Sequence, residues 1–150
     1  MQGLLRKVKR LLISNNMFTG TLPTELGNMH GVERLWLQNN QLSGPIPSEL
    51  GLLDSNTEPI EVVRVIDKGI RNVTSILLHD NDLTGTVPSS LGMLGMLKAL
   101  EIYNNSGLTG DIPTSLCDLE SWPEGGGLKI DCELVSCNCS ACNCLPVWSD

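Results

Sequence analysis

Apolar and polar residues follow one frame in four stretches of the chain. The frame L-x-x-L-x-L-x-x-N-x-L begins at Val8, Val32, Val73 and Leu97, and 24 residues separate both the first two starts and the last two starts. Apolar residues at every second position predict a short strand with one buried face. A fixed period of this length predicts coils that stack side by side, so that their strands form one parallel sheet over a continuous core.

Four positions of each repeat are predicted to point into the core, because a stack of similar coils buries the same apolar position in every coil. These core positions are Val8, Leu11, Ile13 and Phe18; Val32, Leu35, Leu37 and Leu42; Val73, Ile76, Leu78 and Leu83; and Leu97, Leu100, Ile102 and Leu108. An asparagine follows each predicted strand, and its carboxamide can bond the backbone of the turn and of the next coil. We therefore expect a structural asparagine ladder of Asn16, Asn40, Asn81 and Asn105.

The second half of each repeat carries a glycine and a proline at fixed positions. The segments are TGTLP at 19–23, SGPIP at 43–47, TGTVP at 84–88 and TGDIP at 109–113. The glycine suits a tight bend, and the proline precedes a short helical turn. Over about residues 8–121 the repeats resemble the plant-specific subclass of leucine-rich repeats, which is found in receptor-like kinase ectodomains and polygalacturonase-inhibiting proteins.

The resemblance implies a right-handed leucine-rich-repeat superhelix of the α/β solenoid class. Short parallel strands would line its concave face, an extra short strand would lie on the flank, and 3₁₀ or helical turns and loops would form the convex side. It also implies a non-enzymatic recognition role toward a protein, peptide or glycan, in a receptor-like ectodomain or a secreted binding or inhibitor protein. The chain carries no protein-kinase motif and no nucleotide-binding glycine loop, and no nucleophile–base pair can be assigned.

The period is broken between the second and third frames, whose starts at Val32 and Val73 lie 41 residues apart. The extra segment, residues 56–72, contains IEVVRVIDKGI, which fits the strand half of the frame, but it lacks the G-x-φ-P half. Two interpretations stay open: a degenerate coil, which the in-phase apolar residues favour, or an inserted loop. We thus expect repeats over 1–121, with coils near 8–31, 32–55, 73–96 and 97–121, and a cysteine-rich cap over 122–150.

Residues between the core positions are predicted to lie on the concave face, where a ligand could contact them. An apolar column centred on Trp36, with Tyr103 and His79 nearby, is typical of an interface, because interfaces favour aromatic anchors. The predicted ligand-binding residues are Leu12, Arg34, Trp36, Gln38, Leu77, His79, Glu101 and Tyr103. Parallel strands lie about 4.8 Å apart, so this face is narrower than an interface of ~800 Å² per partner requires. Binding would therefore be weak, use the flanks, or need a longer solenoid.

All six cysteines lie near the C-terminus. They are Cys117, Cys132, Cys137, Cys139, Cys142 and Cys144. The last coil of a solenoid needs a cap, and an even number of cysteines there predicts three disulfides, although their connectivity cannot be read from the sequence. The alternative is a thiolate cluster, because the spacing C-x-C-x₂-C-x-C can bind Zn²⁺ or Cu⁺. The tail resembles the one that closes some algal members of the superfamily, and LKIDCELV at 128–135 predicts one final strand.

Charge and targeting signals limit the partners and the location. A net charge of −7 argues against a nucleic-acid partner, and no apolar run approaches the ~18 residues of a membrane span. Disulfides and candidate glycosylation sites at Asn72, Asn104 and Asn138 predict a secreted or extracellular protein. Because the N-terminus lacks a signal-peptide pattern, we expect upstream repeats or a membrane-anchored remainder to be missing from this chain. The alternative function is an intracellular interaction scaffold with a zinc-binding tail; otherwise no cofactor is predicted.

Overall fold

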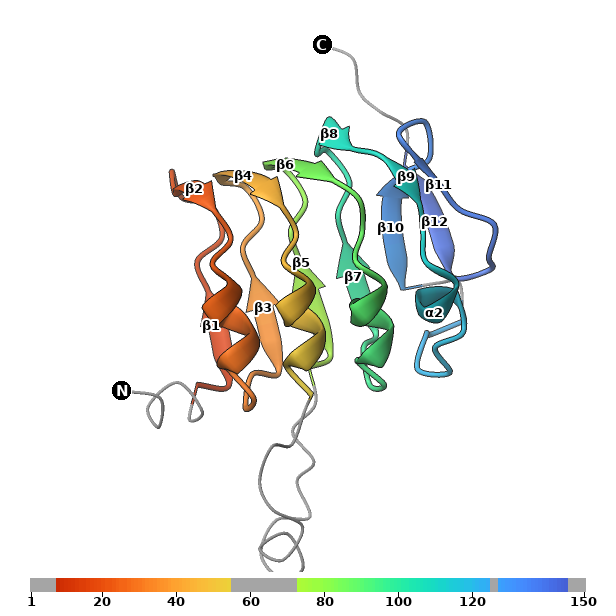
Figure 1. Cartoon of the computed structure of the whole chain (residues 1–150), viewed down its shortest axis with the longest axis horizontal. Helices are drawn as coiled ribbons and strands as arrows, with labels where there is room; N and C mark the ends of the chain where they lie inside the picture. Colours follow the sequence, from red (N-terminus) through yellow and green to blue (C-terminus); the bar gives the residue numbers. More distant parts are fainter. Residues whose placement is uncertain (1–7, 55–72, 125–126, 146–150) are drawn as a thin grey trace, which may run out of the picture.

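The computed structural model describes residues 8–54, 73–124 and 127–145. In this part of the chain, successive coils stand side by side in sequence order and contribute one strand each to a parallel sheet, the main sheet (Figure 1). The strand order is β1-β3-β5-β7-β10-β12. These strands are β1 Arg10–Leu12, β3 Arg34–Trp36, β5 Ser75–Leu77, β7 Ala99–Glu101, β10 Leu128–Asp131 and β12 Cys142–Leu145. The predicted solenoid with short parallel strands is confirmed, and β10 lies within the predicted final strand.

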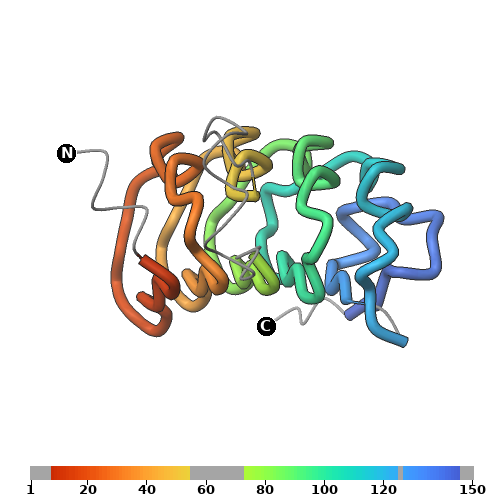
Figure 2. The backbone as a smooth tube through the Cα atoms, turned by 90° about the horizontal axis from the view of Figure 1, so that it is seen from below, coloured from red at the N-terminus to blue at the C-terminus, as the bar shows by residue number. Residues whose placement is uncertain are grey.

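A second parallel sheet lies on the flank of the stack, in the order β2-β4-β6-β8 (Figure 1). Its strands are β2 Thr19–Thr21, β4 Gln41–Pro45, β6 Asp82–Gly85 and β8 Gly107–Leu108. Strand β9 Gly110–Asp111 pairs with β11 Val135–Ser136 of the cysteine-rich tail. Figure 2 shows the coils following one another from the first repeat to this tail. The tail therefore continues the stack, since it adds strands beside the repeats.

A short helical turn follows the proline of each repeat. The turns are the 3₁₀ helices η1 Thr24–Asn28, η2 Ser48–Leu52 and η3 Ser89–Met93, and the α-helix α2 Thr114–Cys117. In each case the proline carbonyl accepts a hydrogen bond from the leucine amide three residues later; in η2, Leu50 donates to Pro47 at 3.1 Å. Because proline cannot itself donate, it suits the first position of such a turn. Within the described ranges, no helix is long and apolar enough to cross a membrane.

Equivalent core positions meet across the main sheet. Leu11, Leu35, Ile76, Leu100 and Leu128 are register partners from one strand to the next. All core positions predicted from Val32 onward are buried. The predicted core is therefore confirmed for the second, third and fourth repeats.

The first repeat departs from this pattern. Three of its predicted core positions are half-buried, and Phe18 is 48% exposed. The corresponding Leu42 is buried because it lies between two coils, whereas no described coil covers Phe18 on its N-terminal side. The prediction that Phe18 lies in the core is therefore wrong for the described structure.

Strand β3 pairs directly with β5, and β4 pairs directly with β6. The described residues therefore place no strand between β3 and β5. Both interpretations of residues 56–72 stay predictions. Residues 55–72 themselves lie outside the described residues. On either side of them, Asp54 and Val73 are joined, because Oδ1 of Asp54 accepts the Val73 amide at 2.7 Å.

Asparagines join neighbouring coils through their carboxamides. Nδ2 of Asn81 donates to the carbonyl of Leu78 in its own turn and to that of Leu37 in the preceding coil, both at 3.1 Å. Its Oδ1 accepts the amide of Leu42, in the preceding coil, at 3.0 Å. The equivalent three bonds are made by Asn40 and Asn105. The side chain of Asn16 donates within its own coil, so the described inter-coil bonds begin at Asn40.

Candidate ligand-binding face

Side chains that point away from the core form a row across the strands of the main sheet. The register pairs Leu12 of β1 with Trp36 of β3, Trp36 with Leu77 of β5, Leu77 with Glu101 of β7, and Glu101 with Lys129 of β10. Side chains alternate between the two faces of a strand, so this row lies opposite the buried leucines. We call the outward surface of β1, β3, β5, β7 and β10, with the residues just after these strands, the candidate face. It brings four of the predicted ligand-binding residues into one row.

Trp36 is fixed at the centre of the apolar part of the candidate face. Its Nε1 donates a hydrogen bond of 3.0 Å to Oγ of Ser75. The guanidinium carbon of Arg34 lies 5.6 Å from the ring centroid, within the range of a cation–π interaction. Leu12, 48% exposed, and the half-buried Leu77 extend this apolar surface on either side. An aromatic ring that is already held in place reduces the entropy that binding would cost.

A polar network lies beside this apolar part. The ring of His79 stacks on that of Tyr103, with centroids 4.4 Å apart. Nδ1 of His79 lies 2.6 Å from Oδ2 of Asp80, and its Nε2 lies 3.6 Å from Oε2 of Glu101. Glu101 also forms an ion pair of 2.7 Å with Nζ of Lys129. The predicted residues His79, Glu101 and Tyr103 are thus brought together and held by their neighbours.

Asp80 and Lys129 complete this network but are absent from the predicted ligand-binding residues. Asp80 directly follows His79 and has a positive φ of 55°. The residues at the equivalent turn of the other coils also have a positive φ: 57° at Asn15, 55° at Asn39 and 52° at Asn104. Lys129 lies beyond the last recognisable frame, so the repeat pattern does not place it on the candidate face. The alternation Leu128-x-Ile130 is the signal that could have placed it there.

Burial raises the pKa of two groups near the polar network, the Tyr103 phenol and the Asp131 carboxyl. Burial, followed by the negative charges of Glu101, Asp80 and Asp131, raises the pKa of the Tyr103 phenol above 10.0. Burial also raises the pKa of Asp131 above 3.8, and this effect outweighs its backbone hydrogen bonds. Oδ2 of Asp131 accepts the Asn104 amide at 2.6 Å, whereas its Oδ1 is buried and meets no hydrogen-bond donor in the part of the chain that the structure describes. Acidic groups therefore gather at the C-terminal end of the candidate face.

Gln38 is the remaining predicted residue of the candidate face. It lies two residues after Trp36 and is half-buried. Its Oε1 is buried and has no hydrogen-bond partner among the described residues. A buried carbonyl without a donor is costly, so this position could gain from a ligand that brings a donor.

The three candidate glycosylation asparagines differ in their surroundings. Asn72 lies outside the described residues. Asn104 is exposed, but its Nδ2 donates to Oδ1 of Asp80 at 2.7 Å, so a glycan on it would disturb the polar network. Asn138 is exposed in the cysteine-rich tail. Glycosylation at these positions stays a prediction.

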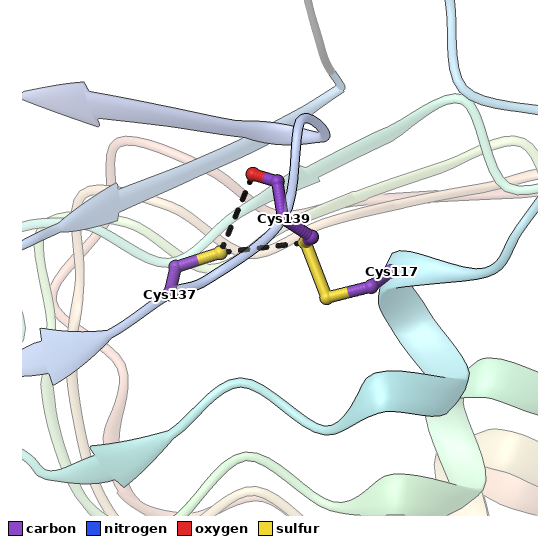
Figure 3. Close-up of side chains that lie close together, drawn as sticks. All are labelled: Cys117, Cys137 and Cys139. Atoms are coloured by element: carbon purple, nitrogen blue, oxygen red, sulfur yellow. Dashed lines mark hydrogen bonds between the residues drawn. A yellow bond between two sulfur atoms is a disulfide. The ribbon is translucent and has the colours of Figure 1, made fainter.

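The six cysteines form three disulfides, Cys117–Cys139, Cys132–Cys144 and Cys137–Cys142. The first links helix α2 to the loop between β11 and β12, as Figure 3 shows. The second links the residue after β10 to β12. The predicted disulfide cap is confirmed.

Residues 7–29, 31–53 and 72–94 match the family model described as Leucine Rich Repeat. No curated protein matches the chain. Among solved structures, the ectodomain of the plant membrane receptor kinase GASSHO1/SCHENGEN3 from Arabidopsis thaliana, in complex with CASPARIAN STRIP INTEGRITY FACTOR 2, is 26% identical over 82% of this chain, with a TM-score of 0.63. The PEPR1–AtPEP1 structure is 30% identical over 93%, with a TM-score of 0.67. The plant peptide hormone receptor RGFR1, in complex with RGF2, is 29% identical over 86%, with a TM-score of 0.53.

The chain spans only a small part of these receptors: 13% of the GASSHO1/SCHENGEN3 chain, 16% of the PEPR1 chain and 21% of the RGFR1 chain. The family model falls on three of the four repeats that the sequence frame defines. The stacked strands, the flanking sheet and the turn after each proline are shared by all four. The chain is therefore built from leucine-rich repeats like those of these plant receptor ectodomains, and its cysteine-rich tail forms a disulfide-bonded cap.

Proposed function

We propose that the chain is a recognition module that binds a peptide, or an extended segment of a protein, on the candidate face. The observation that carries this proposal is the row Leu12–Trp36–Leu77, an apolar strip on an outward sheet face where polar side chains would be expected. Trp36 is held in place by Ser75 and Arg34, as a binding anchor requires. The repeat fold is a binding module without catalytic chemistry of its own, so the role is non-enzymatic.

The charges of the candidate face favour a ligand with distinct ends. Arg10 and Arg34 are register partners on β1 and β3, and both are exposed. Asp80, Glu101 and Asp131 lie toward the other end of the sheet. An extended ligand could place an acidic group near the arginines, an apolar group on Trp36 and a basic group near the carboxylates. Such charge complementarity would fix the orientation of the ligand on the candidate face more than it would raise the affinity of binding.

The similar structures support a peptide as the ligand class. The GASSHO1/SCHENGEN3 and RGFR1 structures are complexes, and RGFR1 is described as a peptide hormone receptor. A glycan is the remaining predicted ligand class, and it would use the same aromatic side chains. Because the chain spans about a fifth or less of these receptors, we propose that further repeats complete the binding surface.

The disulfides support an extracellular location, since such bonds persist in oxidising compartments. The alternative function, an intracellular scaffold that binds zinc through its tail, needs free thiolates. All six cysteines are paired in the structure, so the extracellular function is the better supported of the two.

Selection from a displayed library of random peptides on the immobilised, oxidised chain tests the proposal. Peptides enriched on the chain are then measured by interferometry against Trp36→Ala and Tyr103→Ala. Loss of a central aromatic anchor should weaken binding at least about tenfold, as at other interface hot spots. The matched control is Met93→Ala, which removes a side chain that is 60% exposed on η3, away from the candidate face. Enriched peptides that lose affinity with Met93→Ala and keep it with Trp36→Ala would place binding elsewhere.

A further inference from the structure

The imidazole of His79 lies between two carboxylates from neighbouring coils. Its Nδ1 lies 2.6 Å from Oδ2 of Asp80, the next residue of the same turn, and its Nε2 lies 3.6 Å from Oε2 of Glu101, on β7 of the next coil. Because an ionised carboxylate only accepts hydrogen bonds, the shorter contact requires a proton on Nδ1. The neutral ring therefore presents the lone pair of Nε2 to Glu101, whereas the protonated ring donates to both carboxylates.

Neighbouring side chains hold the His79 ring in this position. Tyr103 stacks on one face of the ring, with centroids 4.4 Å apart. Asp80, which contacts Nδ1, is itself held, because its Oδ1 accepts a hydrogen bond of 2.7 Å from Nδ2 of Asn104. The His79 side chain is only 12% exposed. A ring held in this way keeps Nε2 directed at Glu101 in both charge states, so a change in its charge acts on that carboxylate.

The two carboxylate oxygens of Glu101 meet different groups. Oε1 forms the ion pair of 2.7 Å with Nζ of Lys129. The Lys129 side chain is 41% exposed, and an ion pair with so exposed a partner contributes little free energy and opens easily. Oε2 faces Nε2 of His79, which donates to it only when the ring is protonated. With a neutral ring, Oε2 is therefore an acceptor that a ligand can use.

Most of the charge around His79 is negative. The charged and titratable groups that face it or its stacking partner are Asp80, Glu101, Tyr103, Lys129 and Asp131. Burial and then the three carboxylates raise the pKa of the Tyr103 phenol, so these negative charges converge on one place. On the other side, the equivalent residue of the preceding coil is Gln38, which carries no charge. Among these groups the ammonium of Lys129 alone opposes three carboxylates when His79 is neutral, and a further cation would balance them.

Glu101 directly adjoins the apolar strip of the candidate face. The register pairs Trp36 with Leu77 and Leu77 with Glu101, and neighbouring strands lie about 4.8 Å apart. An aliphatic chain that lies on Leu77 can therefore place its end at Glu101. Lysine and arginine side chains have this form, since each is an apolar stem that ends in a cation.

We propose that Glu101 is a subsite for a cationic group of the ligand, a guanidinium or an ammonium, and that protonation of His79 closes this subsite. The inference rests on the proposed function, because the stem next to the cation would lie on Leu77 and Trp36. Imidazole is the side chain that ordinarily changes charge between about pH 5 and 8. The ligand therefore binds at the upper end of this range and is released at the lower end, where Nε2 donates to Oε2 of Glu101 and the added positive charge repels the cation.

Binding of n-butylguanidinium tests the subsite, because this probe has an apolar stem and a charge that stays constant over the same pH range. The NMR signals of the Tyr103 ring, the only tyrosine of the chain, report binding to the full, oxidised protein. The dissociation constant should be about fivefold higher at about pH 5.5 than at about pH 7.5, the factor for one unit charge about 4 Å away in water. n-Butylurea, which has the same shape without the charge, should show no such dependence. Equal dissociation constants for n-butylguanidinium at both pH values, or no binding at the higher one, would overturn the proposal.

Three variants assign the effect to individual side chains. His79→Gln should bind the probe equally at both pH values, and the fold should accept it, because Gln38 holds the equivalent position in the preceding coil. His30→Gln changes the other histidine of the chain, which follows η1, and should keep the pH dependence. Glu101→Gln should weaken binding about fivefold or more at about pH 7.5. A pH dependence that persists in His79→Gln would assign it to a carboxyl group such as that of Asp131 and would overturn the role of His79.

The subsite and the proposed function can fail separately. Selected peptides that depend on Trp36 but not on Glu101 would retain the recognition function and overturn the subsite. Binding of n-butylguanidinium with the expected pH dependence, without any selected peptide that depends on Trp36, would retain the subsite and contradict the proposed function.

Discussion

The ring of His79 stacks on the ring of Tyr103 across two neighbouring coils, with planes 9° from parallel and centroids 4.4 Å apart. His79 follows β5 and Tyr103 follows β7, so the repeat register alone places them side by side. Tyr103 is the only tyrosine of the chain. Its environment can therefore be followed without interference from another phenol.

Tyr103 should titrate above 10.0, because burial and nearby carboxylates oppose its negative charge. Phenolate absorbance followed against pH measures this midpoint directly. Glu101→Gln should lower the pKa, since it removes a neighbouring negative charge, whereas Glu25→Gln, exposed on η1, should not. The folded chain holds this proton more tightly than the unfolded chain, so the resulting stability is lost as pH rises through the folded pKa. A midpoint at or below 10.0 would contradict the described surroundings.

Asn81→Ala should lower the free energy of unfolding by about 2–3 kcal/mol, because it leaves buried backbone groups of two coils without partners. Asn16→Ala is the matched control, since its side chain is exposed and bonds within one coil. It should cost less than about 0.5 kcal/mol. Urea unfolding of both variants provides the comparison, and similar losses would show that the inter-coil bonds contribute little.

Gly51→Ala should destabilise the chain by about 1–3 kcal/mol, because the added Cβ would collide with the Ser90 carbonyl in the next coil. An added Cβ at the equivalent Gly27 would collide with the Glu49 carbonyl, and at Gly92 with the Ser115 side chain. At Gly95 nothing lies within 4 Å of the added Cβ, so Gly95→Ala should be neutral or stabilise by less than about 1 kcal/mol. Thermal unfolding of the two alanine variants distinguishes them, and an unchanged Gly51→Ala would mean that the coils can separate without cost.

Leu83→Ala should cost about 2–5 kcal/mol, since Leu83 is fully buried between coils. Phe18 holds the same position in the first repeat but is 48% exposed. Phe18→Ala should therefore cost about 1 kcal/mol or less. Denaturant unfolding of the present chain tests the ranking, and an equal loss at Phe18 would reveal a covering contact beyond the described residues.

Asp131→Asn should stabilise the chain at neutral pH. Because burial raises the pKa of Asp131, the folded chain binds more protons than the unfolded chain between 3.8 and the folded pKa. The free energy of unfolding therefore falls as pH rises through that interval, and this loss persists at neutral pH. Asparagine keeps an oxygen acceptor for the Asn104 amide but carries no charge. The gain should shrink when unfolding is measured below pH 3.8, and a gain that is independent of pH would rule out this cause.

Repetition let the sequence determine the stack, the core positions from Val32 onward and the start of each helical turn. A residue that recurs every 24 positions meets its own equivalent in the next coil, so a local pattern fixes a long-range contact. Leu35 against Ile76 and Ile76 against Leu100 follow from the frame once two repeats are known to be adjacent. The even number of cysteines likewise determined that the end of the stack is cross-linked.

Only the tertiary structure decided which coils are adjacent, and what each cysteine and charged side chain meets. Strand β3 pairs directly with β5 although the starts of their frames lie 41 residues apart, a spacing that the 24-residue period does not relate to adjacency. Cys137 bonds with Cys142 while touching Cys139, and Lys129 reaches Glu101 from the tail. These contacts depend on how the chain returns after the repeat pattern ends, where no period relates sequence distance to distance in space.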